Sequence, residues 1–446
     1  MPPESAPLQP ECAGCVLLAE LRRELAALRQ RVEELEQQAH RSAAPFRRPP
    51  EQRGGEQRQP GNKPGHAPAY RLPPPAVDEY AEIPLSACPH CHGPVTHVRP
   101  VAQVIEELPV VAVRRLHLTT YRGHCPQCGE VRSTHPQQIS TATGAAGVHL
   151  GPRALAYAAL LNKHYGLTLR KTCRLLAETF GLSLTPGGLS QALARVAGKV
   201  EPACDHLRAQ LRRSPVVHAD ETGWWLEGQT AWLWVFTNRQ YTLYHIGRRT
   251  QEVVREQLGD DFPGVLVSDC LCAYDAHPGR QSKCVLHHLR AIRAAQEQQP
   301  SSPFLRQVQG LLRGSLALHA VRAQMTRAGY AQAVAAAEAS LDRLLCPAYP
   351  PGPEAKIAHR LRKQRPHLLT FLHVEGVDPT NNQAERQLRP AVIARKLSCG
   401  NKTAAGARTF EILASLAATC AQQGLSFSDQ LVAWLRLGGP PTWDWA

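Results

Sequence analysis

The fold is decided by the stretch that reads PVVHADETGWWLEG (residues 215–228), TAWLWVFTNRQYTLYHI (230–246), RRTQEVVREQL (248–258) and GVLVSDCLCAY (264–274). One apolar run ends in Asp220, two further runs are rich in Val, Trp, Tyr and Leu, and after a helical segment a short apolar run ends in Asp269. This pattern predicts the order strand, strand, strand, helix, strand. The fold class is therefore α/β with a mixed sheet.

Two carboxylates stand at predicted strand ends. In a mixed sheet the first and fourth of these strands can lie side by side, so that Asp220 and Asp269 face a common point. Two carboxylates there suit Mg²⁺ or Mn²⁺, which prefer oxygen ligands. Taken alone, each Asp is also an ordinary turn residue at a strand end. A third carboxylate is needed to decide between a metal site and two ordinary turn residues.

The segment TNNQAERQLRPAVIARK, from Thr380 to Lys396, supplies that third carboxylate. Asn381 and Asn382 suit the start of a helix, and Glu385 falls in its first turns. A carboxylate on a helix packed against the sheet completes an Asp, Asp, Glu set. Five other acids are interpreted as caps, turn residues or salt-bridge partners: Glu221, Asp260, Asp261, Asp275 and Asp378.

The length and charge of the chain limit the number of domains and the kinds of partner that it can have. The 446 residues have room for roughly three domains. Lys and Arg outnumber Asp and Glu by 51 to 37, a formal net charge of +14, which favours polyanionic partners such as nucleic acid. The N-terminus shows no secretory leader and the chain no apolar run of 18 or more residues, so we expect a cytoplasmic protein without membrane contact.

The N-terminal residues 1–38 predict a coiled-coil helix. Their apolar residues alternate at spacings of three and four from Leu18 to Leu35, as in a heptad seam, although a plain surface helix fits the same pattern. Cys12 and Cys15 supply only half a zinc site and remain unassigned. Residues 39–76 form a Pro/Gly-rich basic linker, either a solvated spacer or a segment that lies along phosphates.

Two CxxC pairs predict a zinc-ribbon-like domain over residues 77–140. Cys88 and Cys91 form one pair and Cys125 and Cys128 the other, which together give a closed tetrahedral Cys₄ site for structural Zn²⁺. The segment between the pairs contains strand-like runs. These runs carry Arg114, Arg115 and Arg122, which would suit a module that reads DNA. A purely structural role for the domain is the alternative.

Residues 141–205 predict a helical domain. The segment 168–180 is an amphipathic helix with Thr168 as N-cap and Gly181 as its stop, and Thr185-Pro186 opens the next helix. This is the helix-turn-helix outline, although many helical hairpins bind nothing. The catalytic core then spans residues 206–425, with one more strand at 282–286 and a helical insertion at about 288–374, and residues 426–446 form a C-terminal tail.

With these residues in place, the chain resembles the DDE transposases of bacterial insertion sequences, most closely the insertion sequence 66 family. The carrying motifs are HADET at Asp220, LWVF at 233–236, SDCLCAY at 268–274, CVLHHLR at 284–290 and NNQAERQLRP at 381–390. The resemblance spans nearly the whole chain, since the N-terminal coiled coil, the GNKPG-like linker, the paired CxxC motifs and the C-terminal helical tail also match the family's layout. The resemblance implies an RNase H-like core with Asp220, Asp269 and Glu385 as catalytic triad and Mg²⁺ or Mn²⁺ ligands. It further implies an enzyme that cleaves and transfers DNA strands.

The same resemblance implies further roles. Cys284 and His287 match a Cys-x-x-His signature with an accessory, structural or DNA-end role, for which simple packing is the alternative. Four basic residues would bind DNA phosphates: Arg386, Arg389, Arg395 and Lys396. The implied partners are the terminal inverted repeats of the element, target DNA, further copies of the chain and companion proteins of the same element.

The sequence departs from its relatives locally, since Asp269 is followed by Cys270-Leu271 rather than Gly-Tyr, and Val285-Leu286 replaces an aromatic residue. None of these departures removes an acid of the triad. Two alternative functions stay open: a domesticated or inactive relative that acts as a zinc-dependent DNA-binding protein, and an RNase H-like nuclease acting on RNA hybrids or junctions.

Overall fold

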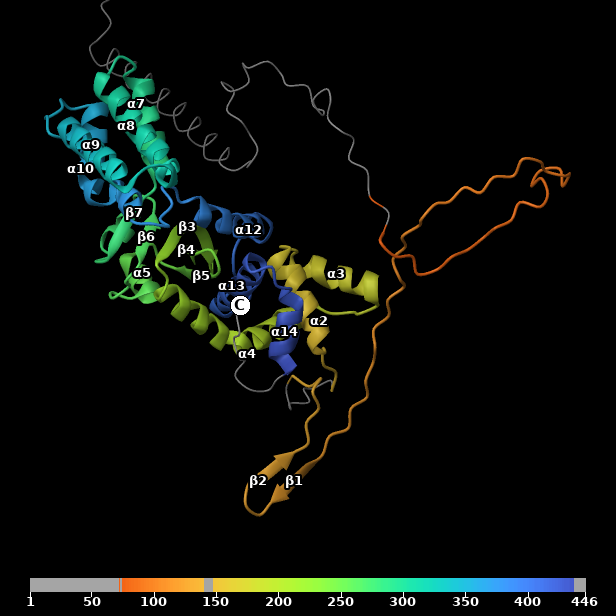
Figure 1. Cartoon of the computed structure of the whole chain (residues 1–446). Helices are drawn as coiled ribbons and strands as arrows, with labels where there is room; N and C mark the ends of the chain where they lie inside the picture. The colour runs from red at the N-terminus through yellow and green to blue at the C-terminus, as the bar shows by residue number, and fades with distance from the viewer. Residues whose placement is uncertain (1–71, 73, 140–146, 437–446) are drawn as a thin grey trace, which may run out of the picture. The chain divides into compact units, whose positions relative to one another are not determined.

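The computed structural model describes residue 72, residues 74–139 and residues 147–436 (Figure 1). The chain divides into two units, residues 1–108 and residues 109–446. The predicted coiled coil, Cys12 and Cys15, and nearly all of the predicted linker lie outside the described residues. The described part of the first unit contains no helix or strand.

The second unit opens with a two-stranded hairpin around the second CxxC pair. Strands β1 (Arg122–Cys125) and β2 (Gly129–Arg132) pair antiparallel, with Cys125 opposite Gly129. The strands expected before β1 are absent from residues 101–121, so Arg114 and Arg115 lie outside any strand. Strand propensity was not enough there, because Val110 and its apolar neighbours are exposed and have no layer to pack against.

A five-stranded mixed sheet forms the core, in the order β5-β4-β3-β6-β7. Strands β3, β4 and β5 pair antiparallel, whereas β6 runs parallel to β3 and β7 parallel to β6. Helix α5 (Gln251–Leu258) connects β5 to β6. The predicted neighbours, the first and fourth strands of the core, do lie side by side. The strand bounds are β3 Val216–Leu226, β4 Gln229–Thr237, β5 Thr242–Gly247, β6 Val265–Ser268 and β7 Arg280–Lys283.

Strand β3 runs further than the sequence predicted, because it continues past Asp220 to Leu226. The pairing with β4 carries it on to a tight turn in which Glu227 and Gly228 both have positive φ, at 54° and 78°. On its other side β3 pairs with β6 only from Val216 to His218. Asp220 therefore lies within a strand, just beyond the end of its parallel neighbour.

Helix α13 (Ala404–Gln422) closes one edge of the sheet with polar side chains. The backbone N–H groups of Thr242, Tyr244 and Ile246 in β5 donate to Thr419 Oγ1 (3.0 Å), Ser415 Oγ (2.8 Å) and Glu411 Oε1 (2.6 Å). The three acceptors are four residues apart and so share one face of the helix. A strand edge that would otherwise be open to another chain is thereby satisfied.

Helix α3 begins and ends where the sequence predicted, and α4 begins at the predicted residue but runs on to Arg212 without a break. Thr168 Oγ1 accepts a hydrogen bond from the N–H of Lys171 at the start of α3, and Gly181 ends this helix in the left-handed conformation. Thr185 caps α4, which is one continuous helix through Pro202 and ends next to β3. With α14 these helices share a core with α13 and one face of the sheet. Their bounds are α2 Pro152–Ala159, the π-helix η2 Leu160–His164, α3 Leu169–Phe180, α4 Pro186–Arg212 and α14 Phe427–Arg436.

A helical insertion follows β7 (Figure 1), and its core continues onto the sheet through Val265 and Val267 of β6. The strand expected at 282–286 ends at Lys283, and the helix begins at Val285 instead. The chain then returns to the sheet as α12, which packs on β3 and β4. The bounds here are α6 Cys272–Asp275, α7 Val285–Gln298, α8 Pro303–Ala320, η3 Arg322–Gln324, α9 Arg327–Leu345, α10 Pro353–Leu368, α11 Thr370–His373 and α12 Asn382–Ser398.

A substitution at Gly264 can test how closely the starts of β3 and β6 approach each other. A Cβ atom at this position would lie 2.3 Å from Ser214 O, and the next residue, Val265, donates its N–H to Pro215 O. We expect Gly264→Ala to lower the free energy of unfolding by roughly 1–3 kcal/mol, because the backbone must shift. Chemical denaturation checks this.

The matched control is Gly198→Ala on the exposed side of α4, where an added Cβ meets nothing within 4 Å. Alanine there should raise stability by roughly 0.5–1 kcal/mol. Equal stability changes in the two variants would contradict the close approach at Gly264.

Candidate active site

Three acidic residues from three elements converge beside the end of β6. Asp220 lies on β3, Asp269 directly follows β6, and Glu385 is in the first turn of α12. Asn381, at the start of α12, is fully buried and fixes this helix to β3, since its Nδ2 donates to Ala219 O at 2.8 Å. The N–H of Asn381 also donates to Cys284 Sγ at 3.2 Å. The helix start that carries Glu385 is therefore tied to the residue before Asp220.

The electrostatics of Asp220 reflect both its burial and its acidic neighbours. Burial and the charges of Glu221, Asp269 and Glu385 raise the pKa of Asp220 from 3.8 to about 7, although the N–H of Glu221 donates to its Oδ1 and opposes the shift. Asp269 is oriented by the N–H of Leu271, which donates to its Oδ1 at 2.9 Å. The site thus gathers more negative charge than it compensates.

This donor set fits a hard divalent cation. Carboxylate oxygens are the ligands that Mg²⁺ and Mn²⁺ prefer, and a cation would relieve the repulsion that raises the pKa of Asp220. Within the described ranges, no three His, Cys, Asp or Glu side chains are already drawn together at ligand distance. Asp220, Asp269 and Glu385 would have to close around the ion.

The predicted basic residues divide into two groups. Arg386, Arg389 and Lys396 are exposed on α12. Arg395 is half-buried, and its guanidinium donates to Thr222 Oγ1 at 3.1 Å and to Gly223 O. Arg395 therefore holds α12 against β3 instead of facing solvent.

Residues 147–409 match the family described as Transposase IS66 family, and this range covers more than half of the chain. The chain belongs to the IS66 transposase family. Members are DDE transposases, which use divalent metal to cleave DNA and transfer its strands, so this chain is a DNA-binding enzyme of that class. A search of the curated proteins finds no match.

Cys284 and His287 lie at the start of α7, next to the site of the transposase. The Cys284 thiol is buried, which raises its pKa. Burial and the nearby Arg290 lower the pKa of His287. Arg290 also forms an ion pair with Glu385 at 3.7 Å, an arrangement that the sequence did not reveal. This part of α7 therefore supplies Glu385 with a positive neighbour.

Glu221, which the sequence presented as an ordinary ion-pair partner, is the centre of a buried network. Its Oε2 accepts from Tyr274 Oη at 2.6 Å, and its Oε1 accepts from Arg249 at 2.7 Å. The Arg249 guanidinium lies 4.0 Å from the ring centroid of Trp232. Because Tyr274 belongs to α6, the network joins the segment after Asp269 to the strand that carries Asp220.

A second network holds α6 from its other side. Asp275 forms ion pairs with Lys283 at 3.1 Å and with Lys363 at 2.7 Å, and Lys283 is fully buried. The Lys283 ammonium also donates to Ser268 Oγ at 3.2 Å, one residue before Asp269. Both ends of the loop 269–275 are thus fixed by buried charge.

Asp260 and Asp378 do act as predicted, since Asp260 forms an ion pair with Arg255 and Asp378 accepts the N–H of Thr380 in a turn.

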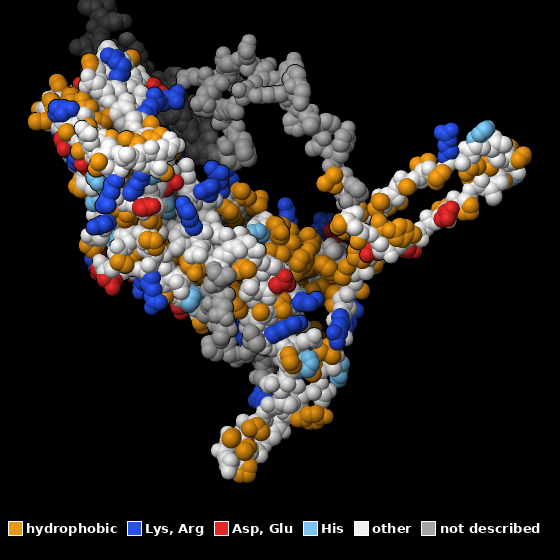
Figure 2. All heavy atoms as spheres, viewed as in Figure 1, with side chains coloured by type: hydrophobic (Ala, Val, Ile, Leu, Met, Phe, Trp, Pro, Cys, Tyr) orange, Lys and Arg blue, Asp and Glu red, His pale blue; other side chains and the backbone are white. Residues whose placement is uncertain are grey.

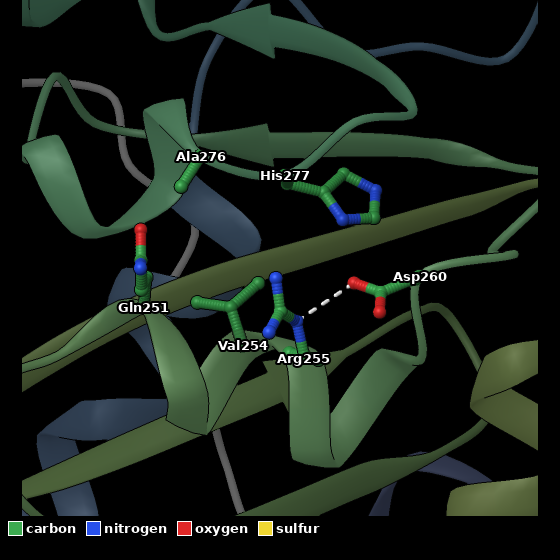
Figure 3. Close-up of a pocket in the computed structure, with 6 residues that line it drawn as sticks. All are labelled: Gln251, Val254, Arg255, Asp260, Ala276 and His277. Atoms are coloured by element: carbon green, nitrogen blue, oxygen red, sulfur yellow. Dashed lines mark hydrogen bonds and ion pairs between the residues drawn. The ribbon is translucent and has the colours of Figure 1, made fainter.

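A separate pocket lies between α5 and α6 (Figure 3). Its volume is about 10 Å³, room for about one water molecule, and the Arg255–Asp260 ion pair spans part of its wall. None of the predicted site residues lines it.

No described helix is long and apolar enough to cross a membrane.

The raised pKa of Asp220 predicts how stability depends on pH. The folded, metal-free transposase holds a proton on Asp220 up to a pH of about 7, whereas the unfolded chain releases it near 3.8. Between these two pH values the unfolded chain ionises and the folded protein does not, so the free energy of unfolding falls as the pH rises from about 3.8 to 7. Asp220→Asn should therefore gain roughly 1–3 kcal/mol over wild type on going from pH 5 to pH 8. Denaturation at both pH values in chelator measures it.

Asp275→Asn is the control, because its expected effect on stability at high pH is opposite to that of Asp220→Asn. Burial disfavours ionised Asp275, but Lys363, Gln364 and Lys283 outweigh it and lower its pKa, so this substitution should destabilise the protein at pH 8. A pH-independent effect of Asp220→Asn would contradict the electrostatic account.

Tyr274→Phe removes the hydroxyl donor of the buried Glu221 carboxylate. We expect a loss of about 1–3 kcal/mol in stability, together with weaker Mn²⁺ binding by titration calorimetry, because the Asp269 loop is no longer held to β3. Tyr330→Phe is the matched control, since it loses a hydrogen bond of 3.1 Å to Leu372 O in the helical insertion. That variant should lose stability and keep its Mn²⁺ affinity. If both variants bind Mn²⁺ like wild type, the network does not position the acids.

Proposed function

We propose that Asp220, Asp269 and Glu385 are the catalytic triad of this transposase and hold its Mg²⁺ or Mn²⁺. The observation that carries the proposal is the placement of the acids: Asp220 and Asp269 stand just past the paired ends of β3 and β6, and Asn381 ties the start of the helix that carries Glu385 to Ala219. Burial and the charges of its acidic neighbours raise the pKa of Asp220, as such a placement requires. The three acids come from separate elements whose positions are set by sheet pairing and by Asn381. A mixed five-stranded sheet with helices packed around it is consistent with an RNase H-like core for such a triad.

Strand cleavage requires an attacking water and a stabilised leaving oxygen. Bound divalent metal supplies both an activated water and charge compensation at the phosphate. The three carboxylates would hold that metal beside β3 and β6, where the reacting phosphate would lie, while Arg386, Arg389 and Lys396 would bind neighbouring phosphates of the same strand. Cleavage frees a 3′-hydroxyl at the element end, and that hydroxyl then attacks target DNA in the same site. No side chain of the protein becomes covalently linked.

Structural Zn²⁺ at the two CxxC pairs is a further part of the proposal. In each pair, backbone N–H groups of the following residues lower the pKa of the first thiol: those of Cys91 and His90 act on Cys88, and those of Cys128 and Gln127 on Cys125. Thiolates are the form that binds zinc. The tight turn from Cys125 to Gly129 supports a zinc-binding turn. The residues 77–140 would then act as a zinc-ribbon-like domain.

Binding of the terminal repeats would involve the helical domain at 141–205. Helices α3 and α4 form a helix, short turn and helix, and exposed Lys171, Arg174 and Arg195 give them a basic surface. Joining two element ends in one event requires at least two active sites, so we include assembly of several copies, and companion proteins where the element encodes them.

Substitution of the acids tests the triad. Asp220→Asn, Asp269→Asn and Glu385→Gln should each abolish strand cleavage of DNA carrying the element ends, because one metal ligand is lost. DNA binding in a gel-shift assay should be retained. Asp260→Asn is the control, because Asp260 pairs with exposed Arg255 and should leave cleavage unchanged. Cleavage at the wild-type rate in any one triad variant removes that residue from the metal site.

Elemental analysis of the purified protein tests the zinc proposal. About one zinc per chain is expected from a Cys₄ site, and Cys125→Ser should lose the metal and weaken DNA binding. Cys346→Ser changes an exposed cysteine of the helical insertion and should keep both. Protein free of zinc, or equal zinc in the two variants, would show that the CxxC pairs serve another purpose.

A further inference from the structure

Helix α10 of the insertion turns one face towards the loop that follows Asp269. Lys363 forms an ion pair with Asp275 at 2.7 Å, and Gln364 Nε2 donates to Asp275 Oδ1 at 3.1 Å. Arg360 precedes these two residues by three and four positions, so it lies on the same face of the helix, one turn earlier. Arg360 is therefore directed at an earlier part of the same loop.

Arg360 also lies close to the residue that follows Asp269. Helix α10 packs against α7, and Cys270 Sγ lies 3.3 Å from His288 Nε2 on α7. Burial raises the pKa of Cys270, and Arg360 is the charge that opposes this shift most. Burial and next Arg360 lower the pKa of His288 to about 3. The guanidinium is therefore a neighbour of both Cys270 and His288, beside the loop that carries Asp269.

Arg360 has no partner for its charge among the described residues. Its Nε is buried and makes no hydrogen bond, and the rest of its guanidinium forms neither a hydrogen bond nor an ion pair there. Other arginines of α10 are paired, since Arg362 donates to Leu345 O at 2.7 Å and Arg365 forms an ion pair with Asp342 at 2.6 Å. A half-buried guanidinium without an acceptor costs free energy. This cost indicates an anion that another molecule supplies.

His287 presents a second unpartnered donor in the same region. Arg290 Nη1 lies 3.4 Å from His287 Nε2, and because a guanidinium only donates, His287 Nε2 is the acceptor. The neutral ring then carries its proton on Nδ1, which is buried and has no partner among the described residues. Burial and Arg290 lower the pKa of His287 most, and Arg360 adds to this shift. The carboxylates of Asp269 and Glu385 oppose it, so the unpartnered N–H has Arg360 and two acids of the proposed triad as neighbours.

A phosphate group of DNA is the acceptor that suits this place. A phosphodiester carries a negative charge and accepts hydrogen bonds at its oxygen atoms, and arginine is well suited to bind it. Water accepts the same hydrogen bonds but does not compensate the charge of the guanidinium. Figure 2 shows Lys and Arg side chains on the surface where the helical insertion meets the sheet. A polyanionic strand that crosses this surface would be attracted to it along its length.

We propose that Arg360 binds a phosphate of the DNA strand in the active site, on the side of Asp269 that faces the helical insertion. The inference rests on the proposed triad, because Asp269 marks where the reacting strand lies. The insertion thereby takes a direct part in positioning the DNA, besides packing against the sheet.

The test measures the affinity of the full-length protein for a duplex that carries an element end, in chelator, so that the DNA is not cleaved. In a set of further duplexes, one phosphate at a time near the cleavage point is replaced by an uncharged methylphosphonate. Wild type should lose about tenfold in affinity at one or two of these positions. Arg360→Gln should bind the unmodified duplex about tenfold more weakly and no longer respond to methylphosphonate at those positions. Arg360→Lys keeps the charge and should lose less.

Arg313→Gln is the matched control, because it removes an exposed cation of α8 in the same insertion and should bind and respond as wild type does. Denaturation of Arg360→Gln separates a structural role from a role in DNA binding. Loss of an uncompensated charge should leave the free energy of unfolding unchanged or raise it.

Equal affinity of wild type and Arg360→Gln for the unmodified duplex would overturn the proposal. So would an Arg360→Gln protein that is less stable than wild type, since Arg360 would then serve to hold the insertion in place. A failure of the proposed triad is recognised separately, as cleavage by Asp269→Asn at the wild-type rate, because the binding assay contains no metal.

Discussion

The short parallel pairing between β3 and β6 is the constraint on which the site depends. Only Val216 to His218 pair with β6, after which the two strands part. Asp220 emerges from the sheet just past this pairing, and Asp269 follows the last residue of β6. Gly264 permits the approach that starts the pairing, because its hydrogen atom faces Ser214 O where no methyl group fits. A shift of one residue would turn the Asp220 side chain to the other face of the sheet.

Buried charge around the acids has a physical cost that the surrounding networks offset. Glu221, Tyr274 and Arg249 join one side of α6 to β3, and Asp275 and Lys283 join its other side to β7. In these two networks each charged side chain has an opposite charge or a hydrogen-bond donor as partner. Asp220 differs, since its neighbours Glu221, Asp269 and Glu385 share its sign. The protein thus compensates the charges that hold the loop, whereas the acids around Asp220 leave room for the cation that we propose there.

Much of this organisation was predictable from the sequence because the signals are local. Thr168 with Gly181 and Thr185 with Pro186 mark helix ends through their own backbone contacts, and the strand order follows from apolar runs. The grouping of the acids required only the strand order and the helix that begins beside Asn381. The family resemblance is confirmed by the match over residues 147–409.

Other features depend on contacts between distant parts of the chain. The continuation of β3 beyond Asp220 was missed because its partner β4 sustains it. The expected strands in 101–121 did not form because nothing packs on them. The role of Glu221 depends on Tyr274, 53 residues later, and that of Arg395 on Thr222, 173 residues earlier. No local pattern encodes these pairings.

The central claim is that Asp220, Asp269 and Glu385 surround one metal site. Iron-directed hydroxyl-radical cleavage of the full-length protein tests it most directly, since Fe²⁺ replaces Mg²⁺ at oxygen-ligand sites and cuts the backbone beside its ligands. The account predicts cuts in three separate segments, near residues 220, 269 and 385, that excess Mg²⁺ suppresses together. Cuts confined to one of these segments, or Mg²⁺-sensitive cuts elsewhere in the chain, would contradict it.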